Sequence, residues 1–213
     1  MQKKPHILDL FCAAGGAAMG YHQSGFEIIG CDNKPQPNYP FKFFKGDWQQ
    51  ALQKYSAWAD AIHASPPCQE YSVTRSLHSN THDALIEPVR QALQATGKPY
   101  IIENVPPAPL RNAIILDGPM FNLKVIKKRK FESNVLLLKP GNGAIHGKVI
   151  EYAKQRLNPD YYYYITAGHM PGTVKQWSDA LGISWMKNKS ELAQAIPPSY
   201  THFLGNQLQQ FIT

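Results

Sequence analysis

The chain has 213 residues and a net charge of +7, with 22 Lys and Arg against 15 Asp and Glu, which fits one sizeable domain with a nucleic acid or other polyanion as partner. Its 43% apolar and 11% aromatic residues suffice for a packed core, which excludes a largely disordered protein. No apolar run approaches the roughly 18 residues of a membrane span, so we expect no membrane partner. The three cysteines are far apart and form no Cys-x-x-Cys pair, so we expect a cytoplasmic protein with neither a disulfide framework nor a metal site.

Short apolar runs alternate with helix-like segments through the first hundred residues, a pattern typical of a parallel sheet with crossover helices. The last of these segments has Leu85, Val89 and Leu93 at helical spacing. An α/β fold with a doubly wound, mostly parallel sheet is therefore predicted. The predicted strands are 7–11, 26–31, 42–44, 61–64 and 100–102, and the predicted helices are 17–23, 48–57, 83–95 and 176–181.

The chain divides into three regions by composition. Residues 1–132 form the predicted core, and 133–172, which include a Gly-rich stretch, form a small inserted region. Residues 173–213 form a C-terminal segment, whose part 195–209 is expected to pack back onto the core.

Chemically suggestive residues follow each predicted strand. They are the turn 12–16 after the first strand, Asp32 after the second, Asp47 after the third, residues 65–68 after the fourth and Glu103 after the fifth. Because ligands bind beyond the carboxyl ends of parallel strands, we expect these residues to converge on one rim.

The first three strand ends suit an adenosine ligand. Gly15 and Gly16 let the backbone approach a ligand, and Asp32 can accept hydrogen bonds from ribose hydroxyls. The G-x-G-x-x-G spacing that receives a pyrophosphate is missing, while Asp47 and Trp48 suit an adenine amino group and ring. An adenosine ligand without phosphates is favoured, although the glycines alone are equally consistent with a simple tight turn.

Two further residues suggest covalent chemistry. Cys68 follows two prolines that stiffen the chain and would present the thiol on a fixed loop, although most lone cysteines are inert buried residues. Glu103 ends an apolar strand, where shielding from water would raise its pKa and suit it to act as a general acid. A surface carboxylate is the equally weighted alternative.

Residues 124–130 hold five cations in seven positions, consistent either with a solvated face or with a phosphate-binding strip. The tyrosines 161–164 are consistent with a core strand, which is favoured, or with a surface on which bases stack.

Together these residues resemble the cytosine-5 DNA methyltransferase family, in matching order along nearly the whole chain. One short fragment is weak evidence, but seven in the right order are hard to obtain by chance. The similar segments are 9–16 (cofactor loop), Asp32 (ribose), Asp47 (adenine side), 66–69 (nucleophile), 103–105 (proton donor), 127–129 (the family's Arg-x-Arg element) and 205–208 (terminal motif).

The resemblance implies a Rossmann-like methyltransferase fold and transfer of a methyl group from S-adenosylmethionine to carbon 5 of a flipped or unpaired cytosine in DNA. Cys68 would add to carbon 6, Glu103 would protonate ring nitrogen 3, and Arg129 with Lys127 would position the base. Residues 69–81 would form a lid. The cofactor-binding residues implied are Phe11, Ala14, Gly15, Gly16, Asp32, Asp47, Trp48, Pro67 and Asn206, with no metal and a monomeric enzyme.

Three departures from the family pattern stand out. Ala13 replaces a glycine of the cofactor loop, which leaves open whether the donor carries methyl or a modified group, and Lys127 replaces an arginine. Residues 133–172 are far shorter than the usual target-recognition region, as in compact, virus-type members, so specificity should be short or relaxed. The same chemistry on a free pyrimidine nucleotide or RNA, and a silent DNA-binding relative, are the alternatives.

Overall fold

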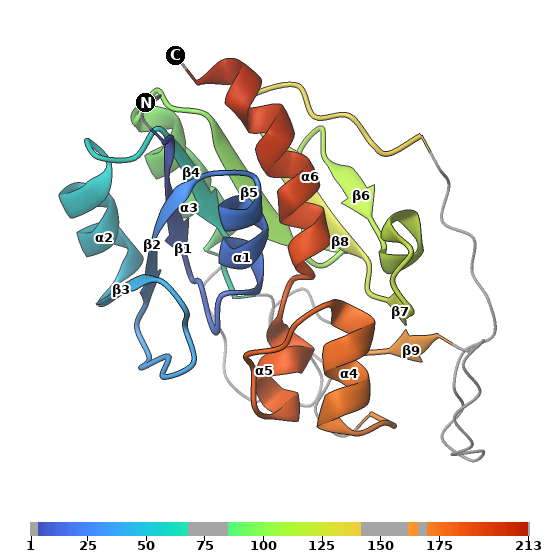
Figure 1. Ribbon diagram of the computed structural model, residues 1–213. Helices are drawn as coiled ribbons and strands as arrows, with labels where there is room; N and C mark the ends of the chain where they lie inside the picture. The colour runs from blue at the N-terminus through green and yellow to red at the C-terminus, as the bar shows by residue number, and fades with distance from the viewer. Residues whose placement is uncertain (1–3, 68–84, 142–161, 166–169, 213) are drawn as a thin grey trace.

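Figure 1 shows the computed structural model, which describes residues 4–67, 85–141, 162–165 and 170–212. The strands are β1 (His6–Leu10), β2 (Glu27–Asp32), β3 (Lys42–Lys45), β4 (Ala61–Ala64), β5 (Tyr100–Asn104), β6 (Ile114–Leu116), β7 (Val125–Ile126), β8 (Arg129–Ser133) and β9 (Tyr163–Tyr164). The helices are α1 (Gly16–Gln23), α2 (Trp48–Tyr55), α3 (Ile86–Ala95), α4 (Val174–Leu181), α5 (Lys189–Gln194) and α6 (Pro198–Leu208), with short 3-10 turns η2 (Gly118–Phe121) and η4 (Gln209–Phe211).

The central sheet has seven strands in the order β3-β2-β1-β4-β5-β8-β6. The first five run parallel, whereas β8 is antiparallel to both of its neighbours. The chain order reverses between β1 and β4, and this switch point is where an open α/β sheet binds its ligands. The predicted α/β fold with a mostly parallel, doubly wound sheet is confirmed.

Helices cover both faces of the sheet (Figure 1). Tyr21 of α1 and Tyr200 of α6 join the apolar cluster on one face, and Val89 of α3 joins the cluster on the other. Helices α1 and α6 can approach closely because Gly20 has no side chain. A Cβ at this position would lie 2.1 Å from the Thr201 hydroxyl oxygen. A third cluster joins α4 and α5 to the two-stranded sheet β7-β9.

The structure extends or adds several elements. β5 continues to Asn104, so Glu103 lies within the strand rather than after it. Strands β6 to β8 and helices α5 and α6 were not predicted. One reason is that β8 has a charged rather than an apolar sequence. Its Glu132 is nevertheless buried, because it forms an ion pair with the buried Arg90 of α3.

Only parts of two sequence predictions can be placed. Tyr163 and Tyr164 form β9, in line with the strand interpretation, and Tyr164 is 47% exposed. Residues 69–81, the predicted lid, lie outside the described residues, as do 142–161 and 166–169 of the predicted insert. None of the helices in the described ranges combines the length and apolarity needed to cross a membrane.

Candidate active site

The turn between β1 and α1 lies at the switch point of the sheet. Gly15 has φ +83°, in the left-handed region that favours glycine. A Cβ at Gly16 would lie 2.5 Å from the main-chain oxygen of Ile196, in the segment just before α6. Both glycines are therefore required by the tight path of the backbone at this rim.

Hydrogen bonds from distant segments hold the same turn. The amide of Ala13 donates to the Asp32 carboxylate at 3.1 Å, and the indole of Trp185 donates to the carbonyl of Ala14 at 2.8 Å. The other Asp32 oxygen accepts from the Lys34 amide. Since each carboxylate oxygen has two lone pairs, Asp32 retains acceptor capacity for a ligand.

The end of β3 contributes an acid and an aromatic ring. Asp47 caps α2 in a reciprocal capping box with Gln50, so part of its acceptor capacity is used locally. Trp48 and Phe11 flank one side of the rim, with ring centroids 6.3 Å apart. Phe11 itself has φ +60°, uncommon for a non-glycine residue and a mark of a constrained turn.

Asp9, the fourth residue of β1, is a buried acid that the sequence indicated only as the first residue of the segment 9–16. Neither carboxylate oxygen has a hydrogen-bond partner among the described residues. Burial, and then Asp32 and Glu103, raise the pKa of Asp9 well above its usual range. A cationic ligand beside these acids would offset that cost, whereas the pyrophosphate of NAD would increase it. The sequence feature that could have identified Asp9 is a lone acid inside an otherwise apolar strand.

Glu103 and Arg129 form the centre of the polar site. Glu103 is 6% exposed, and Arg129 Nε lies 3.0 Å from its Oε1 oxygen across the β5-β8 pair. Burial raises the pKa of Glu103, while Arg129, a hydrogen bond from Ser65 and the charge of Lys127 each lower it, leaving a net rise. Oε1 accepts no hydrogen bond from the described residues. This carboxyl is suited to hold and release a proton.

The segment after β4 approaches Glu103 from the neighbouring strand. The Asn104 side chain donates to the carbonyl of Pro66 at 2.9 Å, which ties this segment to the end of β5. Pro67 is exposed at the same rim. Cys68, the predicted nucleophile, lies outside the described residues.

Two buried polar residues behind Glu103, Tyr21 and His63, were not singled out from the sequence, whereas the half-buried Ser65 was named there only as part of 65–68. His63 Nδ1 lies 2.9 Å from the Tyr21 hydroxyl, and Nε2 lies 2.9 Å from the Ser65 hydroxyl. Burial lowers the pKa of His63 to about 3, so the imidazole is neutral. The signal in the sequence was a histidine between alanine and isoleucine residues of a short buried strand.

The basic cluster 124–130 is not a strip of free cations. Lys127 is 2% exposed, and its ammonium donates to the carbonyls of Ile165 at 3.0 Å and Ala193 at 2.6 Å. These bonds join β7-β9 and α5 to the core. Lys130 bonds a carbonyl and Arg129 pairs with Glu103, so the exposed members are Lys124 and Lys128.

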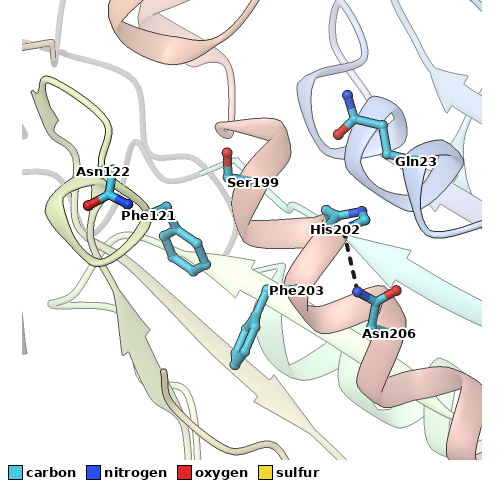
Figure 2. A pocket seen from close by; sticks show the side chains of 7 residues that line it. All are labelled: Gln23, Phe121, Asn122, Ser199, His202, Phe203 and Asn206. Atoms are coloured by element: carbon cyan, nitrogen blue, oxygen red, sulfur yellow. Dashed lines mark hydrogen bonds between the residues drawn. The ribbon is translucent and has the colours of Figure 1, made fainter. Parts of the chain in front are cut away.

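Asn206 lies away from the other predicted cofactor residues. It lines an open pocket of about 300 Å³ with Gln23 and His202, on the outer side of α1 and α6 (Figure 2). Gln23 lies at the far end of α1, about 10 Å along the helix axis from Gly16 at 1.5 Å per residue, and Asn206 lies in the last turn of α6. The C-terminal segment reaches that turn through Ile196 instead.

The same α/β fold is found in solved structures of methyltransferases. The S. pombe Dnmt2 methyltransferase aligns with a TM-score of 0.69 at 14% identity, covering 98% of this chain and 99% of that chain. The Entamoeba histolytica methyltransferase EhMeth aligns with a TM-score of 0.63 at 14% identity, covering 99% of both chains. At these identities the likeness shows the fold.

Part of the sequence matches a known family. Residues 6–108, just under half of the chain, match the family model described as C-5 cytosine-specific DNA methylase. The type II methyltransferase M.FnuDI of Fusobacterium nucleatum is 33% identical over 78 residues, which are 33% of this chain and 23% of that protein. The match thus spans about a quarter of that relative. Among the described residues, no group of three or more His, Cys, Asp or Glu is placed to hold a metal ion.

Proposed function

We propose that the chain is a DNA (cytosine-5)-methyltransferase that uses S-adenosylmethionine and a covalent cysteine adduct. The observation that supports this most directly is the pair of the buried Glu103 with Arg129 across β5 and β8. It stands one strand away from residues 65–67, which lead into Cys68. A shielded carboxyl and a nucleophile are the two groups that activation of a cytosine ring requires.

Glu103 would act on the pyrimidine as the proton donor. Attack at carbon 6 pushes electron density onto ring nitrogen 3, and a proton or hydrogen bond from Glu103 would stabilise it. The raised pKa of Glu103 favours the protonated form that this role needs. Arg129 would hold the carboxyl in place and then stabilise it once the proton has been given up.

Cys68 would supply the nucleophile. Its thiolate would bond to carbon 6 and make carbon 5 an enamine-like nucleophile. After alkylation of carbon 5, loss of the proton on that carbon restores the ring and expels the thiolate. Since a stacked cytosine exposes no face at carbon 6, the base must be flipped out or already unpaired.

The rim around the glycine turn fits the proposed cofactor. S-adenosylmethionine supplies an electrophilic methyl group on a positively charged sulfur. Asp32 would accept from the ribose hydroxyls, Trp48 and Phe11 would contact the adenine ring, and Gly15 and Gly16 would allow close approach of the backbone. The orphaned carboxyl of Asp9 beneath the turn favours a cation here.

The remaining assignments are part of the same proposal. Residues 1–132 would be the cofactor-binding core, 133–172 a reduced target-recognition insert and 173–213 the segment that completes the core. Trp185 and Ile196 support the last assignment, since both contact the glycine turn. A monomer acting on DNA with short or relaxed specificity is the form we propose.

Release of tritium from carbon-5-labelled cytosine tests this function. The substrates are duplex DNA, single-stranded DNA, RNA and the free mononucleotide, each with S-adenosylmethionine. We expect release from DNA and at most trace release from the others. Release from RNA or the mononucleotide alone would reassign the substrate, and no release from any of them, with intact binding of DNA, would identify a silent relative.

A further inference from the structure

A chain of buried hydrogen-bonding groups runs behind Glu103. It begins on α1 with Tyr21, continues through His63 on β4 and reaches Ser65, with oxygen-to-nitrogen distances of 2.9 Å at both ends of the imidazole. Tyr21 and His63 are fully buried. Among the described residues the Tyr21 hydroxyl has no other hydrogen-bond partner than His63. These groups serve no step of the proposed reaction directly.

The sheet register brings this chain to the carboxyl of Glu103. His63 is level with Ile101 and Ala64 is level with Ile102 in the parallel β4-β5 pair. Ser65 therefore stands beside Glu103, and side chains at alternate positions share a face of the sheet. The Ser65 hydroxyl is the hydrogen-bond neighbour that favours the ionised form of Glu103.

The number of hydrogens in the chain sets its direction. A neutral imidazole has one donor and one acceptor nitrogen, and a serine hydroxyl has one hydrogen. If Nε2 carries the hydrogen, it donates to Ser65, whose own hydrogen is then directed at Glu103, and Nδ1 accepts from Tyr21. In the other tautomer the Ser65 hydrogen turns to His63 and the Glu103 carboxylate loses its donor.

We propose that Tyr21, His63 and Ser65 form a relay that holds the Ser65 hydrogen on the Glu103 carboxyl, making them positioning residues for this acid. The inference rests on the proposed function of Glu103 as the proton donor. The relay stabilises the carboxylate of Glu103 once its proton has passed to the base. It is a feature of this chain's own residues on α1 and β4.

Other charged groups face Glu103 and share in its control. Arg129 lies on β8 at 3.0 Å, and the buried Lys127 precedes that strand. Asp9 lies on β1, level with His63, and the charge of Glu103 contributes to the raised pKa of Asp9. Because these groups are unchanged when Ser65 is replaced, the effect of the relay can be isolated from theirs.

Nitrogen-15 NMR of His63 tests the relay without any need for activity. With ring-labelled histidine, and His63→Gln to assign the signal, we expect a neutral ring carrying its hydrogen on Nε2 between pH 6 and pH 8. Ser65→Ala should then populate both tautomers. A wild-type ring that is charged at pH 6, or that carries its hydrogen on Nδ1, would overturn the proposal.

The pH profile of single-turnover methyl transfer tests the consequence for Glu103. Ser65→Ala removes a donor to the carboxylate, so the pKa of Glu103 rises and the alkaline limb should move up by about one pH unit. Ser65→Thr keeps the hydroxyl and should keep the wild-type limb. The matched control is Ser24→Ala, which removes a buried hydroxyl that donates to the Tyr21 carbonyl.

An alkaline limb that stays in place in Ser65→Ala would overturn the relay. If wild-type protein transfers no methyl group to cytosine, the proposed function fails, while the NMR measurement still decides whether the relay exists. The two failures are therefore distinguishable.

Discussion

Replacement of Glu103 by Gln separates the proposed chemistry from the fold. Glutamine keeps the size of the side chain and an acceptor oxygen for Arg129, but it has no acidic proton to give to a base. General acid catalysis contributes about 10²- to 10⁴-fold to a rate. We therefore expect the methyl-transfer rate of Glu103→Gln to fall by at least about 100-fold.

Stability should change in the opposite direction from activity. Because burial raises the pKa of Glu103, the wild-type fold loses stability as the pH rises from the ordinary glutamate pKa to the raised native one, and stays lower above it. Each pH unit between the two corresponds to about 1.4 kcal/mol. Glu103→Gln has no such loss. The difference between its free energy of unfolding and that of the wild type should therefore increase in favour of the variant from pH 5 to pH 8.

Two measurements on the same samples give the result. Single-turnover methyl transfer at pH 7 gives the rate, and urea unfolding at pH 5 and pH 8 gives the stability difference. A variant with activity within about threefold of wild type would refute the role of Glu103. A stability difference independent of pH would refute the claim that its carboxyl is held in a shielded site.

Two further substitutions test how the structure holds the site together. Gly16→Ala places a Cβ 2.5 Å from a main-chain oxygen, so it should cost about 1 to 3 kcal/mol of stability and weaken cofactor binding. Gly141 has open space around it, so Gly141→Ala should change neither stability nor cofactor binding. Equal melting temperatures for the two variants would contradict this packing. Arg90→Met leaves the buried Glu132 without its partner and should cost about 3 to 5 kcal/mol by urea unfolding. Arg111→Met, at an exposed ion pair, should cost under about 1 kcal/mol, and an equal loss in both would show that burial is not decisive.

The parallel half of the sheet could be predicted because its strands are short apolar runs separated by helices. Strand 61–64 was predicted at its observed bounds, and Gly15, Gly16 and Asp32 fell at the ends of their strands. The antiparallel strand β8 was not recognised, since Arg129 and Glu132 look exposed in a sequence. Only the structure shows that their charges are paired with Glu103 and Arg90.

The features that could not be predicted from the sequence depend on contacts between residues that are distant along the chain. The burial of Lys127 depends on carbonyls of Ile165 and Ala193, which are distant in sequence. A short Gly-Asn string suggested Asn206 for the cofactor pocket, yet the helix that carries it meets the turn at its other end. His63 and Ser65 gained meaning only when the register set them beside Glu103.

A covalent trap tests the central claim most directly. DNA containing 5-fluorocytosine cannot lose the substituent on carbon 5 as a proton, so the adduct with the enzyme should persist in the presence of S-adenosylmethionine. We expect a complex stable to denaturant, with the mass of protein, DNA and one methyl group and with the link at Cys68. The absence of a complex with wild-type protein that binds DNA, or an equal yield with Cys68→Ala, would contradict it.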